Sequence, residues 1–307
     1  GCHICLWYPG DEAPSVGRDW ILDYEDIEED DREGPDFAID PDDGNLLTVR
    51  NIADEPRTFY LSLQEGVLGD EAGCVLETGD TRDDDGVHIE TTTVILLIPP
   101  SSLIDVGYIA CEEIQDVVIH SDIQVFKPRA ADEFNEDAVV ELKTFPLKGE
   151  EPFLCTQAAG GSLTHFAHAG TDYALDFRCE RGTPVRSVCD GRVIDVRSTN
   201  TCGGIDVDNL YKWNSITIQS SNKSLCFDYV HLSPDGITVK VDDLVVEGQI
   251  IAKSGDVGFT PEPHLHFQCL ESSAADACSI PLKFRFGAEL TAVSAEAGKY
   301  YPPPKTV

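Results

Sequence analysis

The sequence predicts a mainly β protein with two domains, an N-terminal β-sandwich-like domain followed by a second, antiparallel β domain. Short segments rich in β-branched and aromatic residues recur along the chain, as strands do. Glycine, proline and aspartate separate these segments at turn-like intervals, and helical periodicity is scarce. A chain of 307 residues with 41% hydrophobic residues is long enough for two domains that each have a core.

The first half of the chain divides into an arm, a domain and a linker. Residues 1–43 are predicted to form an acidic, loop-like arm, with thirteen aspartates and glutamates between positions 19 and 43. In the β-sandwich-like domain, residues 44–145, strand-like stretches at 47–52 and 58–63 flank a turn-like gap and suggest a hairpin. Residues 146–154, which include two prolines, are the predicted linker. Further strands are expected at 87–98, 106–111, 117–126 and 138–142.

The second half is predicted to be one domain, residues 155–285, in which strands alternate with turn glycines. Residues 286–307 are a tail that either wraps back onto this domain or is left exposed. Strand-like segments lie at 193–196, 215–219, 225–232, 237–241 and 264–269.

The net charge of −34 is concentrated in the first half of the chain. Residues 1–150 carry 9 lysines and arginines against 37 aspartates and glutamates, whereas the remaining residues carry 13 against 19. Nucleic acids and anionic membrane surfaces would repel such a half, so they are excluded as its partners. The charge favours solubility or adaptation to high salt. The alternatives are self-assembly or divalent-cation binding through carboxylate clusters at 40–43 and 83–85, neither of which has EF-hand spacing.

The cysteines and the start of the chain predict an exported protein. Eleven cysteines are many for a cytosolic enzyme and fit disulfides in a secreted or extracellular protein, with a periplasmic location as the alternative. The chain begins at Gly1 without a basic and apolar leader and contains no methionine, which favours a mature form that has lost its signal segment. No apolar run approaches the roughly 20 residues of a membrane-spanning helix.

Four histidines and one aspartate have the spacing of a metal site. His168 and Asp172 form an HxxxD pattern, His231 follows a strand-like stretch, and His264 and His266 form an HxH pattern. On a strand, the two histidines of the HxH pattern emerge on the same face. Two imidazoles and one carboxylate satisfy a catalytic zinc ion, which leaves its fourth position to water. The predicted cofactor is therefore Zn2+.

Eight segments surround these residues in a fixed order: His168–Phe177, Gly182–Val185, Asp190–Val193, Asn214–Ile218, Asp228–Ser233, Gly248–Ile251, Ser254–Gly258 and Pro263–Phe267. Together they resemble the lysostaphin-type (LytM-like) zinc metallo-endopeptidases over residues 155–285. The resemblance implies a compact antiparallel β fold, the duplicated hybrid motif, with the active site along a groove. It also implies hydrolysis of cross-links or stem peptides of bacterial peptidoglycan. An insertion at 198–211 departs from the family pattern and is expected to lengthen a groove wall.

Carried over position by position, the resemblance implies that His168, Asp172 and His266 bind zinc and that His231 and His264 flank the attacking water. One of these two histidines would accept the proton of the water, and the other would stabilise the tetrahedral intermediate. The sequence leaves open which is which. The position of His264 on the same strand face as a ligand favours it as the base.

The sequence assigns minor roles to two further residues near the predicted metal ligands. His165 is expected to be a surface or groove-rim histidine, with a metal ligand as the alternative. Asp176 is expected to be a solvated or turn carboxylate, with the orientation of a ligand imidazole as the alternative.

The leading functional hypothesis is a secreted zinc endopeptidase that acts on peptidoglycan or a similar peptide. The alternative is a catalytically silent extracellular binding or assembly scaffold that keeps the peptidase fold. The presence of both His231 and His264 favours catalysis, because zinc binding alone does not require them.

Overall fold

The structure is a computed structural model that describes residues 24–26, 35–70, 72–127, 139–161, 164–221, 225–286 and 292–301. Within these residues the protein is built of β-strands, which confirms the predicted mainly β class. The helical segments described are short 3-10 helices: η2 (Ile114–Asp116), η4 (His165–Ala167), η5 (Val207–Asn209) and η6 (Pro234–Gly236). No helix in the described part of the chain is long and apolar enough to cross a membrane.

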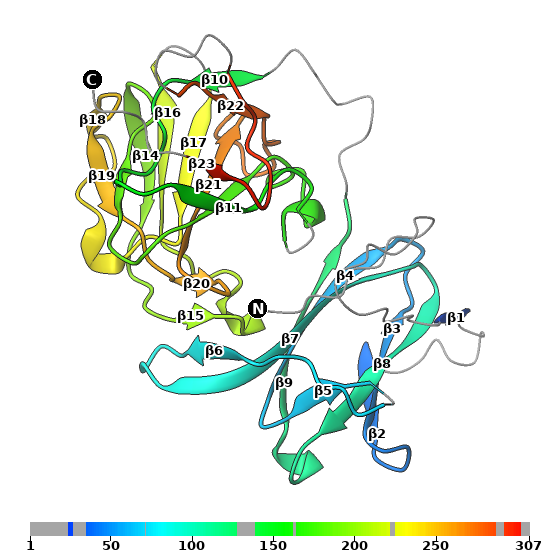
Figure 1. Cartoon of the computed structure of the whole chain (residues 1–307). Coiled ribbons are helices and arrows are strands. Elements are labelled where there is room, and N and C mark those ends of the chain that lie inside the picture. The colour runs from blue at the N-terminus through cyan, green and yellow to red at the C-terminus, as the bar shows by residue number, and fades with distance from the viewer. Residues whose placement is uncertain are drawn as a thin grey trace. The chain divides into compact units, whose positions relative to one another are not determined.

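The chain forms two compact units (Figure 1). Unit 1 comprises the described residues up to Phe126 together with Ile205–Leu210, and unit 2 comprises those from Lys127 to Gly204 and from Tyr211 onward.

Unit 1 contains two antiparallel sheets. The first has the order β1-β8-β3-β2, with β5 also paired to β8: β1 (Tyr24–Asp26), β8 (Ser102–Ala110), β3 (Leu46–Asn51), β2 (Phe37–Asp40) and β5 (Val67–Gly69). The second has the order β6-β7-β4-β9: β6 (Gly79–Arg82), β7 (His88–Ile98), β4 (Arg57–Gln64) and β9 (Val118–Val125). Side chains from both sheets, such as Val49 of β3 and Phe59 of β4, belong to one hydrophobic core.

The predicted hairpin of residues 47–52 with 58–63 is wrong, because β3 and β4 lie in different sheets. β3 pairs with β2 and β8, whereas β4 pairs with β7 and β9. The gap between them carries the chain from one sheet to the other. The buried side chain of Asn51 holds this crossing by donating hydrogen bonds to three carbonyl oxygens, those of Glu55 (2.9 Å), Ile98 (3.2 Å) and Pro99 (2.8 Å).

The predicted acidic arm is described only in part. Its residues 24–26 and 37–40 form strands β1 and β2 at the two edges of the first sheet. Positions 1–23 and 27–34 lie outside the described residues.

The two carboxylate clusters of unit 1 close turns. Oδ1 of Asp40 accepts a hydrogen bond from the backbone N–H of Asp42, and Oδ1 of Asp83 accepts from those of Asp85 and Val87. Neither cluster contains a group of three potential metal ligands among the described residues. The structure therefore gives these carboxylates a role in turns, and divalent-cation binding there stays a prediction.

Unit 2 is organised around an eight-stranded antiparallel sheet of order β18-β14-β16-β17-β21-β12-β11-β23. Its strands are β18 (Leu244–Val245), β14 (Gly191–Arg197), β16 (Ser215–Ser220), β17 (Cys226–Val230), β21 (His264–Leu270), β12 (Leu175–Arg178), β11 (Phe153–Gln157) and β23 (Tyr300–Tyr301). Smaller pairs join β10 (Val140–Leu142) to β22 (Leu282–Phe284), β13 (Pro184–Arg186) to β19 (Ile250–Lys253), and β15 (Gly203–Gly204) to β20 (Gly258–Phe259). The fully buried Phe177, Tyr229 and Phe267 lie in the core against the large sheet.

The division between the units falls earlier than the predicted linker at 146–154. Strand β10 already pairs within unit 2, and β11 is part of the large sheet. Strand β23, in the predicted tail, pairs with β11. Of the insertion at 198–211, residues Ile205–Leu210 belong to unit 1.

The described cysteines form no disulfide bond, so the structure does not support the predicted disulfides. Cys155, Cys179 and Cys269 are buried in the core of unit 2, where they pack as small apolar side chains. Burial raises the pKa of the Cys155 thiol to about 12 and that of Cys179 to about 11. Both thiols are therefore protonated and unreactive near neutral pH. Cys2 and Cys5 lie outside the described residues.

Candidate metal centre and catalytic site

The HxH pair lies on β21, in the interior of the large sheet. Leu265 and Phe267 are fully buried in the core, while His264 and His266 emerge on the other face of the strand. The strand alternation is therefore the one that the sequence pattern predicts. It places both imidazoles where side chains from the neighbouring strands can meet them.

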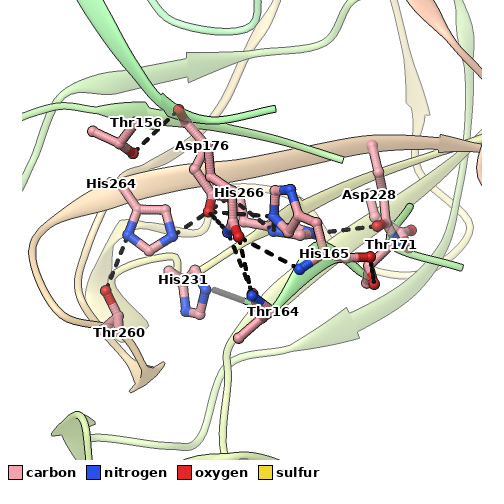
Figure 2. Close-up of polar contacts among 12 residues, drawn as sticks. Thr156, Thr164, His165, Thr171, Asp176, Asp228, His231, Thr260, His264 and His266 are labelled. Atoms are coloured by element: carbon pink, nitrogen blue, oxygen red, sulfur yellow. Dashed lines mark hydrogen bonds and ion pairs between the residues drawn. The ribbon is translucent and has the colours of Figure 1, made fainter. Parts of the chain in front are cut away.

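Asp176 joins the two histidines from the neighbouring strand. β12 pairs with β21 so that Asp176 stands directly opposite His266. Oδ1 of Asp176 lies 2.9 Å from Nδ1 of His266 and 3.7 Å from Nε2 of His264 (Figure 2). The Asp176 side chain is buried, between Leu175 and Phe177 that enter the core. The prediction of a solvated or turn carboxylate is wrong.

His165 reaches the same point from η4. Its Nε2 lies 3.3 Å from Oδ2 of Asp176 and 3.2 Å from Nδ1 of His266, and its side chain is fully buried. Gln157 on β11 anchors this segment: its Oε1 accepts the backbone N–H of Thr164 (3.0 Å), and its Nε2 donates to Oδ2 of Asp176 (2.7 Å). The predicted surface position of His165 is therefore wrong.

His231 follows β17 with a backbone φ of 61°, a left-handed conformation that residues with a side chain rarely adopt. Gly255 approaches this backbone closely, since a Cβ at Gly255 would stand 2.9 Å from the carbonyl oxygen of His231. Nδ1 of His231 donates to the carbonyl of Val257 at 2.7 Å, which leaves Nε2 of the neutral ring as an acceptor. The ring centroids of His231 and His264 are 4.5 Å apart.

In the rings of His165 and His266, one nitrogen faces a partner outside the centre and the other faces the centre. The partner of the first nitrogen determines whether the second carries a lone pair. Nδ1 of His165 faces the carbonyl oxygen of Ala158 at 3.2 Å and donates to it, so Nε2 of the neutral ring is an acceptor. Nε2 of His266 faces Oε1 of Gln268 at 3.1 Å, so Nδ1 is the acceptor. Two lone-pair nitrogens 3.2 Å apart thus converge with the Asp176 carboxylate. The two lone pairs and the carboxylate repel one another unless a cation or a shared proton lies among the three groups.

Residues 167–276 match the model of peptidase family M23. This segment of unit 2 is therefore similar to that family. The glycyl-glycine endopeptidase ALE-1 of Staphylococcus capitis is 38% identical over 106 residues, which are 34% of this chain and 26% of ALE-1. The peptidoglycan DD-endopeptidase ShyB of Vibrio cholerae is 38% identical over 106 residues, 34% of this chain and 20% of ShyB. The chain therefore spans about a fifth to a quarter of the length of these relatives.

A solved structure of the catalytic domain of lysostaphin from Staphylococcus simulans also matches this chain. The two are 28% identical in sequence, and the match covers 42% of this chain and 88% of that domain with a TM-score of 0.32.

The donor set of His165, Asp176 and His266 fits a metal ion of zinc size. His165, Asp176 and His266 each offer one ligand atom, and these atoms all lie within 4.8 Å of one another. A tetrahedral zinc ion with bonds of about 2.0–2.1 Å holds its ligand atoms about 3.3 Å apart. The closest distances between the three groups are 2.9, 3.2 and 3.3 Å. Small outward movements of the side chains would admit the ion.

The charges of the site follow from burial and from the neighbouring rings. Burial by itself raises the pKa of Asp176, but the neighbouring imidazoles of His165, His264 and His266 hold it well below its usual range. Burial lowers the pKa of His231 well below its usual value, and His264 and His266 lower it further. Near neutral pH the site therefore holds a carboxylate anion next to a neutral His231.

The structure does not bring the predicted ligands His168 and Asp172 to this centre. His168 is exposed and forms an isolated β-bridge with Lys127. Asp172 is half-buried, and its carbonyl oxygen accepts the N–H of Gly160. Neither residue belongs to a group of three potential metal ligands in the described part of the chain.

Part of this centre could be predicted from a pattern in the sequence. Leu175, Asp176 and Phe177 alternate apolar, acidic, apolar, which predicts a strand with the aspartate on the open face. No such pattern marks His165, which lies in a short 3-10 helix before the matched segment 167–276. Its position depends on the hydrogen bond between Gln157 and the backbone of Thr164.

Proposed function

We propose that unit 2 is a zinc-dependent endopeptidase that hydrolyses peptide bonds in bacterial peptidoglycan. The observation that carries this proposal is the convergence of His165, Asp176 and His266 beside two further histidines in a chain with a segment similar to peptidase family M23. The names of the relatives, a glycyl-glycine endopeptidase and a peptidoglycan DD-endopeptidase, support the substrate class. Because peptidoglycan lies outside the cytoplasm, this substrate favours a secreted or extracellular location, which includes the periplasm.

We assign the metal to Nε2 of His165, the carboxylate of Asp176 and Nδ1 of His266. This set replaces the predicted one, of which only His266 remains. When bound, zinc lowers the pKa of a water molecule toward about 7 and polarises the peptide carbonyl. The protein's contribution is to hold three donors close together and to direct their lone pairs toward one point.

His231 is the proposed general base. Its Nδ1–H is engaged with Val257, and its ring is neutral near pH 7, so Nε2 is ready to accept the proton of the attacking water. The same nitrogen then delivers the proton to the leaving amine. This assignment differs from the preference for His264 that the sequence suggested.

His264 is the proposed stabiliser of the oxyanion. Its Nδ1 faces the carbonyl oxygen of Glu262 at 2.8 Å and the hydroxyl of Thr260 at 3.0 Å, which fixes the plane of the ring. Its Nε2 is turned toward the centre. Once protonated, this nitrogen donates a hydrogen bond to the negative charge that develops on the peptide oxygen.

The activity is tested on purified peptidoglycan sacculi and on pentaglycine, with and without a chelator. We expect release of new amino groups that the chelator abolishes. His231→Ala should lower turnover by about 10²- to 10⁴-fold, the usual contribution of a general base, while zinc stays bound. His88→Ala, an exposed histidine of unit 1, should have no effect. Stoichiometric zinc without cleavage of any wall type would instead favour the catalytically silent scaffold.

A matched pair of variants tests the ligand assignment. His165→Ala should lose bound zinc, measured by mass spectrometry of the metal content, together with activity. His168→Ala should keep both. Loss of zinc in His168→Ala with retention in His165→Ala would restore the ligand set that the sequence predicted.

A further inference from the structure

An open pocket of about 580 Å³ adjoins the metal centre. Residues of β14, β16, β17 and β21 line it, together with loop residues between 272 and 277. Two of its lining residues also contact the proposed ligands. The hydroxyl of Thr171 donates to the carbonyl of His165 (3.2 Å), and Oε1 of Gln268 accepts from Nε2 of His266 (3.1 Å). A peptide held at the centre therefore has this pocket directly beside it.

Strand pairing brings two carboxylates into this pocket. Gln268 pairs with Asp228 on β17, Asp228 with Thr217 on β16, and Thr217 with Asp195 on β14. Directly paired residues share one face of a sheet. The register between β14 and β16 shifts by one residue at Ile194, so that Ile194 and Asp195 both line the pocket. Such a β-bulge re-aims a side chain that regular alternation would turn away.

Among the described residues that line the pocket there is no lysine or arginine, so none of these residues gives the two carboxylates an opposite charge. Oδ1 of Asp228 is buried and accepts no hydrogen bond, while Oδ2 accepts one from Gln268 (3.1 Å). Burial raises the pKa of Asp228, and the charge of Asp195 adds to this effect. A cation bound in the pocket would lower the pKa of Asp228 and so oppose both effects. Figure 2 shows Asp228 at the end of the site remote from His264.

The arrangement suits an organic cation better than a metal ion. Asp195 and Asp228 are separated by two strand spacings, about 10 Å between backbones. They belong to no group of three potential metal ligands in the described residues. A primary ammonium on a flexible stem carries three donors. It can therefore reach either carboxylate and the hydroxyl of Thr217 between them.

We propose that this pocket, the acidic subsite of Asp195 and Asp228, binds an ammonium group of the peptide substrate next to the bond that is cleaved. The inference rests on the proposed function, because it concerns the substrate specificity of the same site. It names the substrate class more closely: a peptide that carries a free amino group near the scissile bond.

The test uses glycine-rich peptides with one lysine at successive positions, each compared with its Nε-acetyl-lysine counterpart, which keeps the stem and loses the charge. At one or two positions the wild type should cleave the lysine peptide with a kcat/KM about tenfold to hundredfold higher. Asp195→Asn, at a residue with no contact to the ligand histidines, should bring this ratio close to one. Asp235→Asn, at an exposed residue that does not line the pocket, should leave the ratio unchanged.

Two outcomes overturn the proposed acidic subsite: equal cleavage of both peptides by the wild type at every position, or an unchanged ratio in Asp195→Asn. Neither outcome contradicts the proposed endopeptidase function. If no peptide is cleaved, the proposed function fails, and equilibrium binding of the same peptide pairs then decides on the subsite. Tighter binding of the lysine peptide by the wild type but not by Asp195→Asn supports it. Equal binding of the two peptides contradicts it.

Discussion

At the scale of single residues, His231 shows how the backbone prepares the site. Its φ of 61° costs free energy, and such strain persists where the surroundings enforce it. Gly255 is part of these surroundings, because its missing side chain lets the backbone of residues 231–233 pass within contact distance. The hydrogen bond from Nδ1 to Val257 then fixes the ring. The position and the tautomer of this proposed base thus both come from local backbone geometry.

Gly255→Ala should therefore damage catalysis more than folding. Its Cβ would meet the N of Ser233 at 2.7 Å and the O of His231 at 2.9 Å, so the His231 backbone must move. We expect kcat to fall by about tenfold to hundredfold, as small displacements of catalytic groups do, with zinc content unchanged. In Gly182→Ala the new Cβ meets no atom within 4 Å but is strained by a φ of 88°. This control should lose stability only; equal kcat values in the two variants would contradict the prediction.

The depressed pKa of His231 predicts a pH dependence of stability. In the folded state the ring resists a proton that the unfolded chain accepts below about pH 6.5. The stabilisation is therefore complete above that pH and declines below it, by at most about 1.4 kcal/mol per pH unit. Amide hydrogen exchange of β16 and β17 in the chelated protein, corrected for intrinsic rates, measures this between pH 7 and 5. His231→Gln should show a smaller decline, and an equal decline would refute the assignment.

At the scale of elements, strand alternation explains both the core and the site. On β21 and β12 every second side chain enters the core, and the others carry His264, His266 and Asp176. This part of the site is predictable from sequence, because a period of two is a local property. The pairing of β12 with β21 is not local, and it alone places Asp176 opposite His266.

Gln268 extends this strand face and orients a proposed ligand. Its Nε2 donates to Oδ2 of Asp228, so its Oε1 faces Nε2 of His266 and keeps Nδ1 free for the metal. Gln268→Leu should weaken zinc binding by about 10- to 100-fold, measured by competition with a chelating dye. Gln219→Leu changes a residue of β16 that lines the same pocket and should bind zinc normally. If Gln268→Leu binds zinc as tightly as the wild type, Gln268 does not orient the proposed ligand His266.

At the scale of the whole molecule, the two units are not two continuous halves of the sequence. Ile205–Leu210 belong to unit 1, although the residues on both sides belong to unit 2. Within unit 1 the carbonyl of Ile205 accepts hydrogen bonds from the hydroxyls of Ser62 (3.2 Å) and Thr93 (2.5 Å). These six residues therefore have a structural role in unit 1, and the predicted groove-wall role of the insertion stays a prediction.

Asp206 provides a test of this role. Its buried carboxylate accepts hydrogen bonds from Gln64 (2.7 Å), His120 (2.8 Å) and the backbone of Asp208 (2.9 Å). Asp206→Ala removes the acceptor and should lower the unfolding free energy of unit 1 by about 1–3 kcal/mol, seen as faster amide exchange of β4 and β9. Asp208→Ala, at an exposed side chain, should change it by less than about 0.5 kcal/mol. Similar effects of both variants would contradict the predicted role.

The sequence by itself determined the mainly β class, the HxH strand and the resemblance to a peptidase family, because alternation and motif spacing are properties of neighbouring residues. It predicted His168 and Asp172 as metal ligands, whereas the structure brings His165 and Asp176 together with His266. Only the tertiary structure decided this. Convergence of ligand atoms depends on which strands are neighbours and on a loop held by Gln157, and contacts between residues distant in the chain leave no periodic signal.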